Sequence, residues 1–179
     1  MFDSLDKNPD APIAIWLQGG PGSSSLYGAF QEIGAFSINA DGIYNRNEQF
    51  NWNQNMHLLI IDNPVGVGYS FSESSNWAVT DQTMVGSDLY KAMQEFYRAF
   101  PHLRANDLYI TGESYAGKYI PALGSTIVAN NEQVDDELLI NLKGVSIGDG
   151  AMNPPVQFSD FGNLLYERRE WSEARVRRE

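Results

Sequence analysis

The feature that most constrains this chain is a serine placed between a strand and a helix. Residues 107–110 form a short apolar run, residues 111–117 contain the pattern Gly-x-Ser-x-Ala-Gly, and a helix-compatible stretch follows. Small residues on both sides of Ser114 let the backbone turn sharply, so that the hydroxyl is held out beside the free N–H groups of the helix. A weak alcohol nucleophile is presented to a carbonyl carbon in this way, although most turns of this spacing carry no chemistry.

A second turn, rich in glycine, strengthens the interpretation of Ser114 as a nucleophile. Residues 11–17 are almost continuously apolar and run directly into residues 18–22, which read Gln-Gly-Gly-Pro-Gly. A strand that ends in such a turn leaves peptide N–H groups free to bind the negative oxygen of an acyl-transfer intermediate. An ordinary tight turn would use the same glycines, so the oxyanion hypothesis depends on the two motifs occurring together.

The alternation of apolar runs and amphipathic stretches predicts an α/β fold with a mostly parallel sheet flanked by helices. We expect strands over four stretches, residues 11–17, 57–62, 107–110 and part of 138–147. A long helix is expected over residues 80–100 with Thr80 as its cap, and another from Ala116 to about residue 129, with Pro121 near its first turn. Residues 27–32 are expected to be a loop or short helical turn, and residues 39–55 a loop.

Composition and charge exclude several classes of protein. The 179 residues are 42% hydrophobic and 12% aromatic, which is typical of a globular chain, and the net charge of −11 argues against binding nucleic acid or an anionic membrane. The chain has no cysteine, which excludes disulfides and thiolate metal sites. Phe71 stands where a dinucleotide turn beginning at Gly66 would need its third glycine, so no cofactor is expected. The start of the chain does not resemble a signal peptide, and no run approaches the roughly 20 apolar residues of a membrane span.

Several motifs together resemble the serine carboxypeptidase family, namely residues 16–25, 62–70, 112–117 and 144–150. The glycine turn is most similar to that of the vitellogenic-like and retinoid-inducible branch. The resemblance fades beyond Tyr166 and implies an incomplete α/β-hydrolase fold, in which residues 1–166 are an amino-proximal part of the domain. Residues 167–179 are dense in charge, so we expect an exposed tail there, with an exposed helix of Glu-to-Arg pairs as the alternative. The resemblance also implies a secreted or lysosomal location.

The resemblance further implies roles for individual residues. Ser114 would be the nucleophile, and the peptide N–H groups of Gly20 and Tyr115 would form the oxyanion hole. The terminal carboxylate of a peptide substrate would be bound by a set of hydrogen-bonding groups, Trp16, Gln18, Gly19, Glu32 and Glu113. If the two glutamates share a proton, one of them has a raised pKa and can donate to that carboxylate at acidic pH. Gln18 stands where the best-known members have asparagine.

The rest of a catalytic triad is not evident. The chain has two histidines, His57 and His102, and both precede Ser114, whereas this fold places the acid and the histidine after the serine. Each histidine fits a structural role better than a catalytic one, and Asp149 is interpreted as part of a structural turn. We therefore expect a partial chain that lacks the first strands, the triad acid and the triad histidine, and that does not hydrolyse peptides alone.

Three functions from different classes remain open. The first is a serine-type carboxypeptidase that hydrolyses the C-terminal bond of peptides and proteins through an acyl-enzyme on Ser114. The second is an acyltransferase or esterase on the same scaffold, because an alcohol can intercept an acyl-enzyme as well as water can. The third is a non-catalytic form that binds a partner, or another copy as a homo-oligomer, through an exposed sheet edge.

Overall fold

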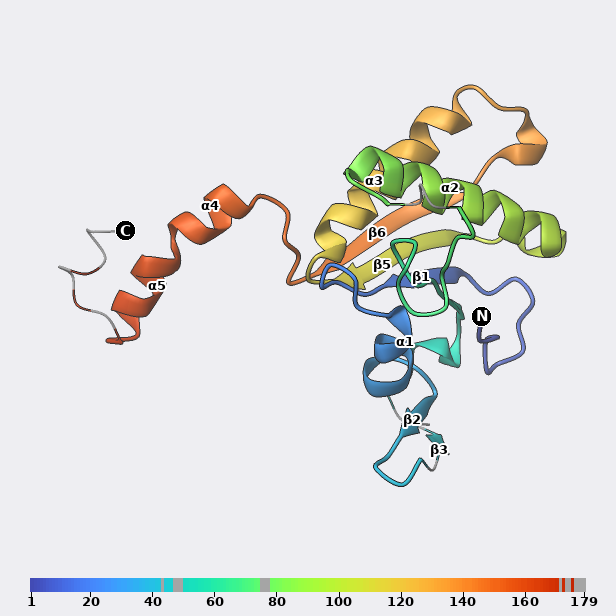
Figure 1. The fold of residues 1–179 in the computed structure, drawn as a ribbon. Coiled ribbons are helices and arrows are strands. Elements are labelled where there is room, and N and C mark those ends of the chain that lie inside the picture. The colour runs from blue at the N-terminus through green and yellow to red at the C-terminus, as the bar shows by residue number, and fades with distance from the viewer. Residues whose placement is uncertain (43, 47–49, 75–77, 171, 173–174, 176–179) are drawn as a thin grey trace.

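The fold is built around a four-stranded parallel sheet, as the sequence predicts (Figure 1). The computed structural model describes residues 1–42, 44–46, 50–74, 78–170, 172 and 175. The strand order is β4-β1-β5-β6. The strands are β1 (Ile13–Leu17), β4 (His57–Ile60), β5 (Leu108–Glu113) and β6 (Leu142–Gly148).

Strand β1 occupies the middle of the sheet and determines where the site forms. All of its residues are buried, which agrees with the continuous apolar run expected of a strand covered on both faces. Its register with β5 pairs Ile13 with Leu108 and Leu17 with Gly112. The carboxyl ends of the two strands are therefore level, so the residues that follow them meet at one end of the sheet.

Two long helices, α2 (Gln82–Ala99) and α3 (Ala116–Asn131), cover one face of the sheet (Figure 1). Helix α2 begins later than predicted, and its N-cap is Asp81 rather than Thr80. Asp81 has an extended backbone and its carboxylate accepts a hydrogen bond from the Met84 N–H, at 2.9 Å. A charged acceptor at this position also interacts favourably with the helix dipole, which explains why Asp81 is preferred over the neighbouring hydroxyl.

Pro121 lies deeper in α3 than predicted. The helix starts at Ala116, so the proline falls in the second turn, where it cannot donate to the Gly117 carbonyl. The helix nevertheless continues to Asn131 because side chains on both sides of the proline, including Ile120 and Leu123, are fully buried against the sheet. Tertiary packing thus offsets the missing hydrogen bond.

Helices α2 and α3 approach closely at Gly86, which gives a first prediction. A Cβ at Gly86 would lie 2.5 Å from Thr126 Oγ1 and 2.6 Å from the Ala122 carbonyl oxygen. We expect Gly86→Ala to lower the free energy of unfolding by about 1–3 kcal/mol through overpacking. Gly124→Ala is the matched control, because its Cβ would meet nothing closer than Val145 Cγ1 at 3.9 Å. It should stabilise the chain by about 1 kcal/mol, since alanine favours a helix over glycine. Urea unfolding curves measure both, and equal effects would contradict the packing argument.

The other face of the sheet carries short elements (Figure 1). They are α1 (Ser25–Tyr27), a π-helical turn η1 (Gly28–Glu32), β2 (Phe36–Ile38), β3 (Tyr44–Arg46) and the 3₁₀ turn η2 (Trp52–Gln54). The prediction of a loop over residues 39–55 is wrong in part, because β3 pairs antiparallel with β2 and η2 is helical. The paired stretch is only three residues long, too short to show a period in the sequence. Residues 43 and 47–49 of that loop lie outside the described residues.

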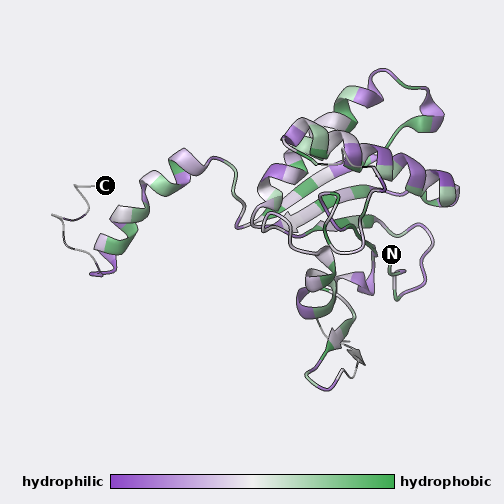
Figure 2. Cartoon of the chain, in the orientation of Figure 1, coloured by the Kyte–Doolittle hydropathy of each residue, from purple (hydrophilic) through white to green (hydrophobic). Residues whose placement is uncertain are grey.

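The last elements project away from the sheet (Figure 1). Helices α4 (Pro154–Ser159) and α5 (Phe161–Glu167) carry hydrophobic residues (Figure 2), and Phe158 is 70% exposed. The described residues beyond α5, which are 168–170, 172 and 175, are all exposed. A tail beginning at residue 167 stays a prediction. Within the described ranges, every helix is too short or too polar to cross a membrane.

Two further 3₁₀ turns connect elements at the opposite end of the sheet. They are η3 (Pro101–Leu103), between α2 and β5, and η4 (Asp136–Leu138), between α3 and β6. They close the chain at the amino ends of β5 and β6, which leaves the carboxyl ends of the strands for the site.

Candidate active site

Ser114 occupies a strained turn at the carboxyl end of β5. It has a positive φ of 55°, which is uncommon for a residue with a side chain, and it is exposed to solvent. Both of its peptide groups are held by the turn after β6. Its N–H donates to the Gly148 carbonyl and its carbonyl accepts from the Ala151 N–H, each at 2.9 Å. The hydroxyl is therefore carried on a fixed, outward-facing backbone at the start of α3.

The glycine turn after β1 lies directly against the Ser114 turn. A Cβ placed on Gly19 would fall 2.6 Å from the Tyr115 nitrogen, 2.7 Å from Ser114 Cβ and 2.9 Å from the Glu113 carbonyl oxygen. Only a residue without a side chain allows this approach. The structure thus brings Gly19, Ser114 and Tyr115 together, with Gly20 next along the chain at a φ of 112°.

A chain of hydrogen bonds between buried side chains lies beside Ser114. Trp16 Nε1 donates to Gln18 Oε1 at 2.8 Å, and Gln18 Nε2 donates to a Glu113 carboxylate oxygen at 2.6 Å. Trp16 and Gln18 are each 6% exposed. The Trp16 ring also meets Trp52 edge to face, with 5.4 Å between ring centroids. Because one end of the Gln18 amide accepts and the other donates, its orientation is fixed, and Glu113 is held next to Ser114.

Glu32 brings a second carboxyl group to the same place. The pKa of Glu32 is raised, and partial burial is the largest cause, although much of the residue remains open to solvent. The Glu113 carboxylate raises the pKa of Glu32 further, by charge repulsion and by a hydrogen bond between the two groups. The charge of Asp149 also raises the pKa of Glu32, by a smaller amount, whereas a hydrogen bond with Gln18 lowers it. The structure therefore brings together Glu32 and Glu113, which lie far apart in the sequence.

The cluster predicts an unusual titration. We expect Glu32 to titrate above the ordinary glutamate range, and Asp149→Asn to lower its pKa because a repelling charge is lost. Asparagine tolerates the positive φ of 37° at this position, so the backbone is retained. Carboxyl carbon NMR titrations of the chain measure the midpoint, with Glu95→Gln as a remote control. An unchanged midpoint in Asp149→Asn would contradict the electrostatic link.

The raised pKa of Glu32 also makes the stability of the fold depend on pH. A glutamate whose folded pKa lies above its unfolded value contributes stability that is fully present below the unfolded pKa. That contribution is lost as the pH rises through the raised pKa of folded Glu32.

Neither histidine lies near Ser114. His57 opens β4 at the amino end of the sheet, where its buried Nδ1 accepts from the Ser4 N–H at 3.2 Å, and His102 lies in η3 before β5. The six residues of β5 separate that end from Ser114, which corresponds to roughly 20 Å at about 3.3 Å per residue. Asp149 lies in the turn that holds Ser114, in agreement with its interpretation as a turn residue. Among the described residues, no cluster of three or more potential ligands could hold a metal ion.

Sequence reasoning missed one residue of this region. Asp62, just beyond the end of β4, binds both the start of α1, at Ser24 and Ser25, and the loop that follows β4, at Tyr69. Its position after a buried strand was the available signal, because the carboxyl ends of parallel strands converge.

Comparison with known proteins agrees with this geometry. Residues 1–178 match the family described as serine carboxypeptidase. A venom serine carboxypeptidase of Apis mellifera is 43% identical over 166 residues, which cover 93% of this chain and 35% of the relative. A vitellogenic carboxypeptidase of Aedes aegypti is 46% identical over 162 residues, 90% of this chain and 33% of the relative.

A solved structure shows the same arrangement of elements. The crystal structure of a prohormone-processing carboxypeptidase from Saccharomyces cerevisiae matches with a TM-score of 0.80 and 32% identity, over 96% of this chain and 37% of the other. The chain spans about a third of the length of these proteins. With the family match over nearly all of its residues and the same α/β-hydrolase fold in a solved relative, this chain belongs to the serine carboxypeptidase family.

Proposed function

We propose that Ser114 is the nucleophile of a serine-type carboxypeptidase that removes the last residue of peptides through an acyl-enzyme. The observation that carries the proposal is the contact between the two turns, in which the Cβ position of Gly19 falls 2.7 Å from Ser114 Cβ. A serine on a strained turn, with a glycine turn directly against it, is the arrangement that acyl transfer requires.

The oxyanion hole in this proposal consists of two peptide N–H groups. Tyr115 directly precedes α3, and its nitrogen faces the Gly19 turn. Gly20 follows Gly19 and has the positive φ that turns the chain at this point. Donors of this kind stabilise the negative oxygen that develops when Ser114 attacks a carbonyl, and losing one typically costs about 3 kcal/mol of barrier.

The selectivity for a chain end is assigned to the carboxyl pair and its neighbours. Glu32 and Glu113 would share a proton and donate it to the terminal carboxylate of the substrate, while Trp16, Gln18 and Gly19 shape the site. The raised pKa of Glu32 supports this role. Because the donor is lost when that proton leaves, binding should be strongest at acidic pH and weaken as the pH rises through the pKa of Glu32.

The histidine base and its acid are proposed to come from outside these residues. Both histidines of the chain lie at the opposite end of the sheet from Ser114, so the chain alone should bind a peptide end without hydrolysing it. The venom carboxypeptidase among the relatives supports a secreted or lysosomal location and peptides as substrates.

Binding can be tested without catalysis. We expect the chain, followed by amide NMR at pH 4.5, to bind a blocked dipeptide with a free carboxylate and to bind its C-terminal carboxamide about tenfold less tightly. Glu32→Gln should remove most of the pH dependence of that preference. A chain that binds both peptides equally would contradict the assignment of the carboxylate site.

A further inference from the structure

We infer that Asp62 is a positioning residue for the carboxylate-binding set, because it joins the loop after β4 to the start of α1, where Ser25 holds Gln18 against Glu113. The inference rests on the proposed function, since it assigns a role within the same site. It gives Asp62 no contact with substrate.

Asp62 uses both carboxylate oxygens to join two separate segments. Oδ1 accepts from Ser24 Oγ at 2.6 Å and from the Ser25 N–H at 2.8 Å. Oδ2 accepts from the Tyr69 N–H at 2.9 Å. Gly68, at a φ of 54°, passes so close to the carboxylate that a Cβ there would overlap it. The loop after β4 therefore wraps around a charged acceptor that also holds the start of α1.

Ser25 carries the connection from Asp62 to the site. Its Oγ accepts from the Gln18 N–H at 3.0 Å and donates to the Ile61 carbonyl at 2.6 Å. The Gln18 side chain in turn donates to Glu113. A continuous path of hydrogen bonds and single residues thus runs from the loop after β4 to the residue before Ser114.

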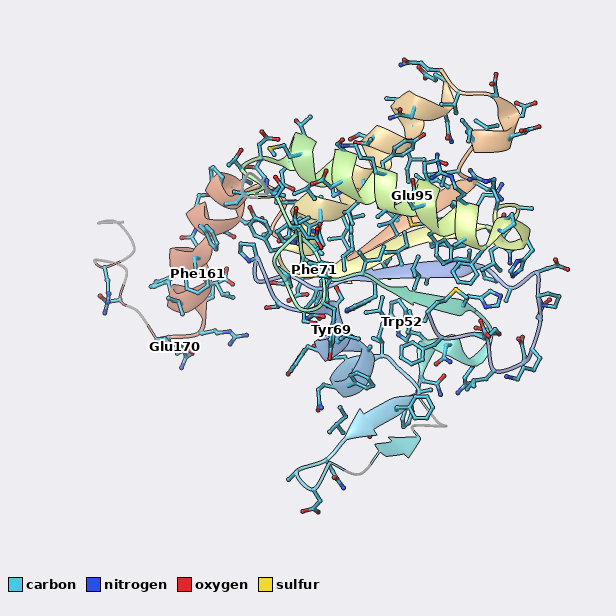
Figure 3. All side chains as sticks on the ribbon, turned by 45° about the vertical axis from the view of Figure 1, so that its right-hand side comes forward. Trp52, Tyr69, Phe71, Glu95, Phe161 and Glu170 are labelled. Carbon is cyan, nitrogen blue, oxygen red and sulfur yellow. The ribbon has the colours of Figure 1, made fainter. Side chains whose placement is uncertain are left out.

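Burial of apolar side chains holds only part of this loop, through Val67, which is 9% exposed. Tyr69 and Phe71, both labelled in Figure 3, are 85% and 80% exposed. Backbone hydrogen bonds join residues 64–70 to one another, and the loop is tied back to Asp62, whose own carbonyl accepts from Ser70 Oγ at 2.7 Å. Only a carboxylate offers acceptors on both sides, because an asparagine would direct its NH₂ group against another donor. Asp62→Asn should therefore release one of the two segments while keeping the side-chain volume.

The experiment compares Asp62→Asn with the unmodified chain by amide NMR at pH 4.5. We expect the affinity for a blocked dipeptide with a free carboxylate to fall about tenfold, since hydrogen bonds to a charged group are lost. The affinity for the matching carboxamide should change little, and the side-chain amide signals of Gln18 should move. Glu95→Gln on α2, which removes an equal charge at a residue paired with Arg98, should change none of these (Figure 3).

Two further variants keep the test decisive if Asp62→Asn unfolds. Ser24→Ala removes one hydrogen bond to the carboxylate, together with the cap that Ser24 Oγ gives the Leu26 N–H, and should cost a few-fold in affinity for the free acid. Ser25→Ala removes the link to Gln18 and should by itself cost a few-fold in affinity for the free acid. If folded, the double variant with Asp62→Asn should lose little more than either single one, because both act through one path.

The outcomes separate this inference from the proposed function. A folded Asp62→Asn chain, or Ser24→Ala if that alone folds, with an unchanged preference for the free acid and unmoved Gln18 signals would overturn the positioning role. An equal loss of affinity for the free acid and the carboxamide would show that Asp62 is only a structural residue, and would also overturn the positioning role. If the unmodified chain shows no preference, the proposed function fails, while movement of the Gln18 signals still measures the connection.

Discussion

Replacing Ser114 by alanine is expected to abolish peptide hydrolysis in an enzyme in which this chain substitutes for the matching third of the Aedes aegypti vitellogenic carboxypeptidase. The rest of that protein would supply the residues that activate the serine. Removing the nucleophile of a triad enzyme typically lowers kcat by about 10⁴-fold or more, because the remaining groups only bind and polarise the carbonyl. Release of the terminal amino acid from a blocked dipeptide at acidic pH measures the rate.

The exposed position of Ser114 makes this variant easy to interpret. The residue protrudes from the sheet and its backbone is held by the turn after β6, so thermal unfolding should be nearly unchanged. The chain without the remainder of the enzyme should show no hydrolysis with either residue at position 114. Hydrolysis that persists in a folded Ser114→Ala enzyme would show that another group is the nucleophile.

Gly19→Ala is expected to lower the stability of the chain strongly, and it should also damage the site. The added Cβ would be placed against backbone atoms of Glu113 and Tyr115, which cannot move aside as a flexible side chain can. We expect a loss of about 3 kcal/mol in the free energy of unfolding, which for a chain of this size corresponds to a fall in Tm of roughly 6–12 °C. Thermal unfolding followed by circular dichroism measures it.

The same substitution at Gly124, where there is room for a methyl group, is the control and should raise Tm slightly. Any folded fraction of Gly19→Ala should have lost its preference for a free carboxylate, because the glycine turn no longer rests on Ser114. A Gly19→Ala chain that is as stable as the unmodified one and still prefers the free acid would contradict the contact between the turns.

The sequence predicted the elements whose determinants are local. The buried strands before Gly19 and Ser114 are continuous apolar runs, and each turn is marked by small residues, so the α/β sheet and the serine turn could be inferred directly. The N-cap of α2 is Asp81, one residue after the predicted Thr80, because both side chains can cap and the choice depends on which one reaches the Met84 N–H. Local patterns narrow such a boundary without fixing it.

Which residues meet in the site could not be predicted from local sequence patterns. Gln18 and Glu113 are 95 positions apart and Asp62 lies 38 positions from Ser24, and no periodicity connects such pairs. Glu32 was proposed only from the family resemblance, since a glutamate on a short turn otherwise reads as a surface residue. Asp62 was missed because its role arises from a loop that wraps around it, which a sequence pattern does not show.

The central place of β1 has a consequence for how the chain folds. The serine turn and the glycine turn that completes it follow neighbouring strands, β5 and β1, and Gln18 and Glu113 beside them are 95 positions apart. During synthesis, the ribosome releases Gly19 long before Ser114, and the two can meet only after β5 has docked beside β1. Contacts of such large sequence separation form slowly. A chain in which β5 has not yet docked beside β1 therefore lacks the contact between the glycine turn and the Ser114 turn.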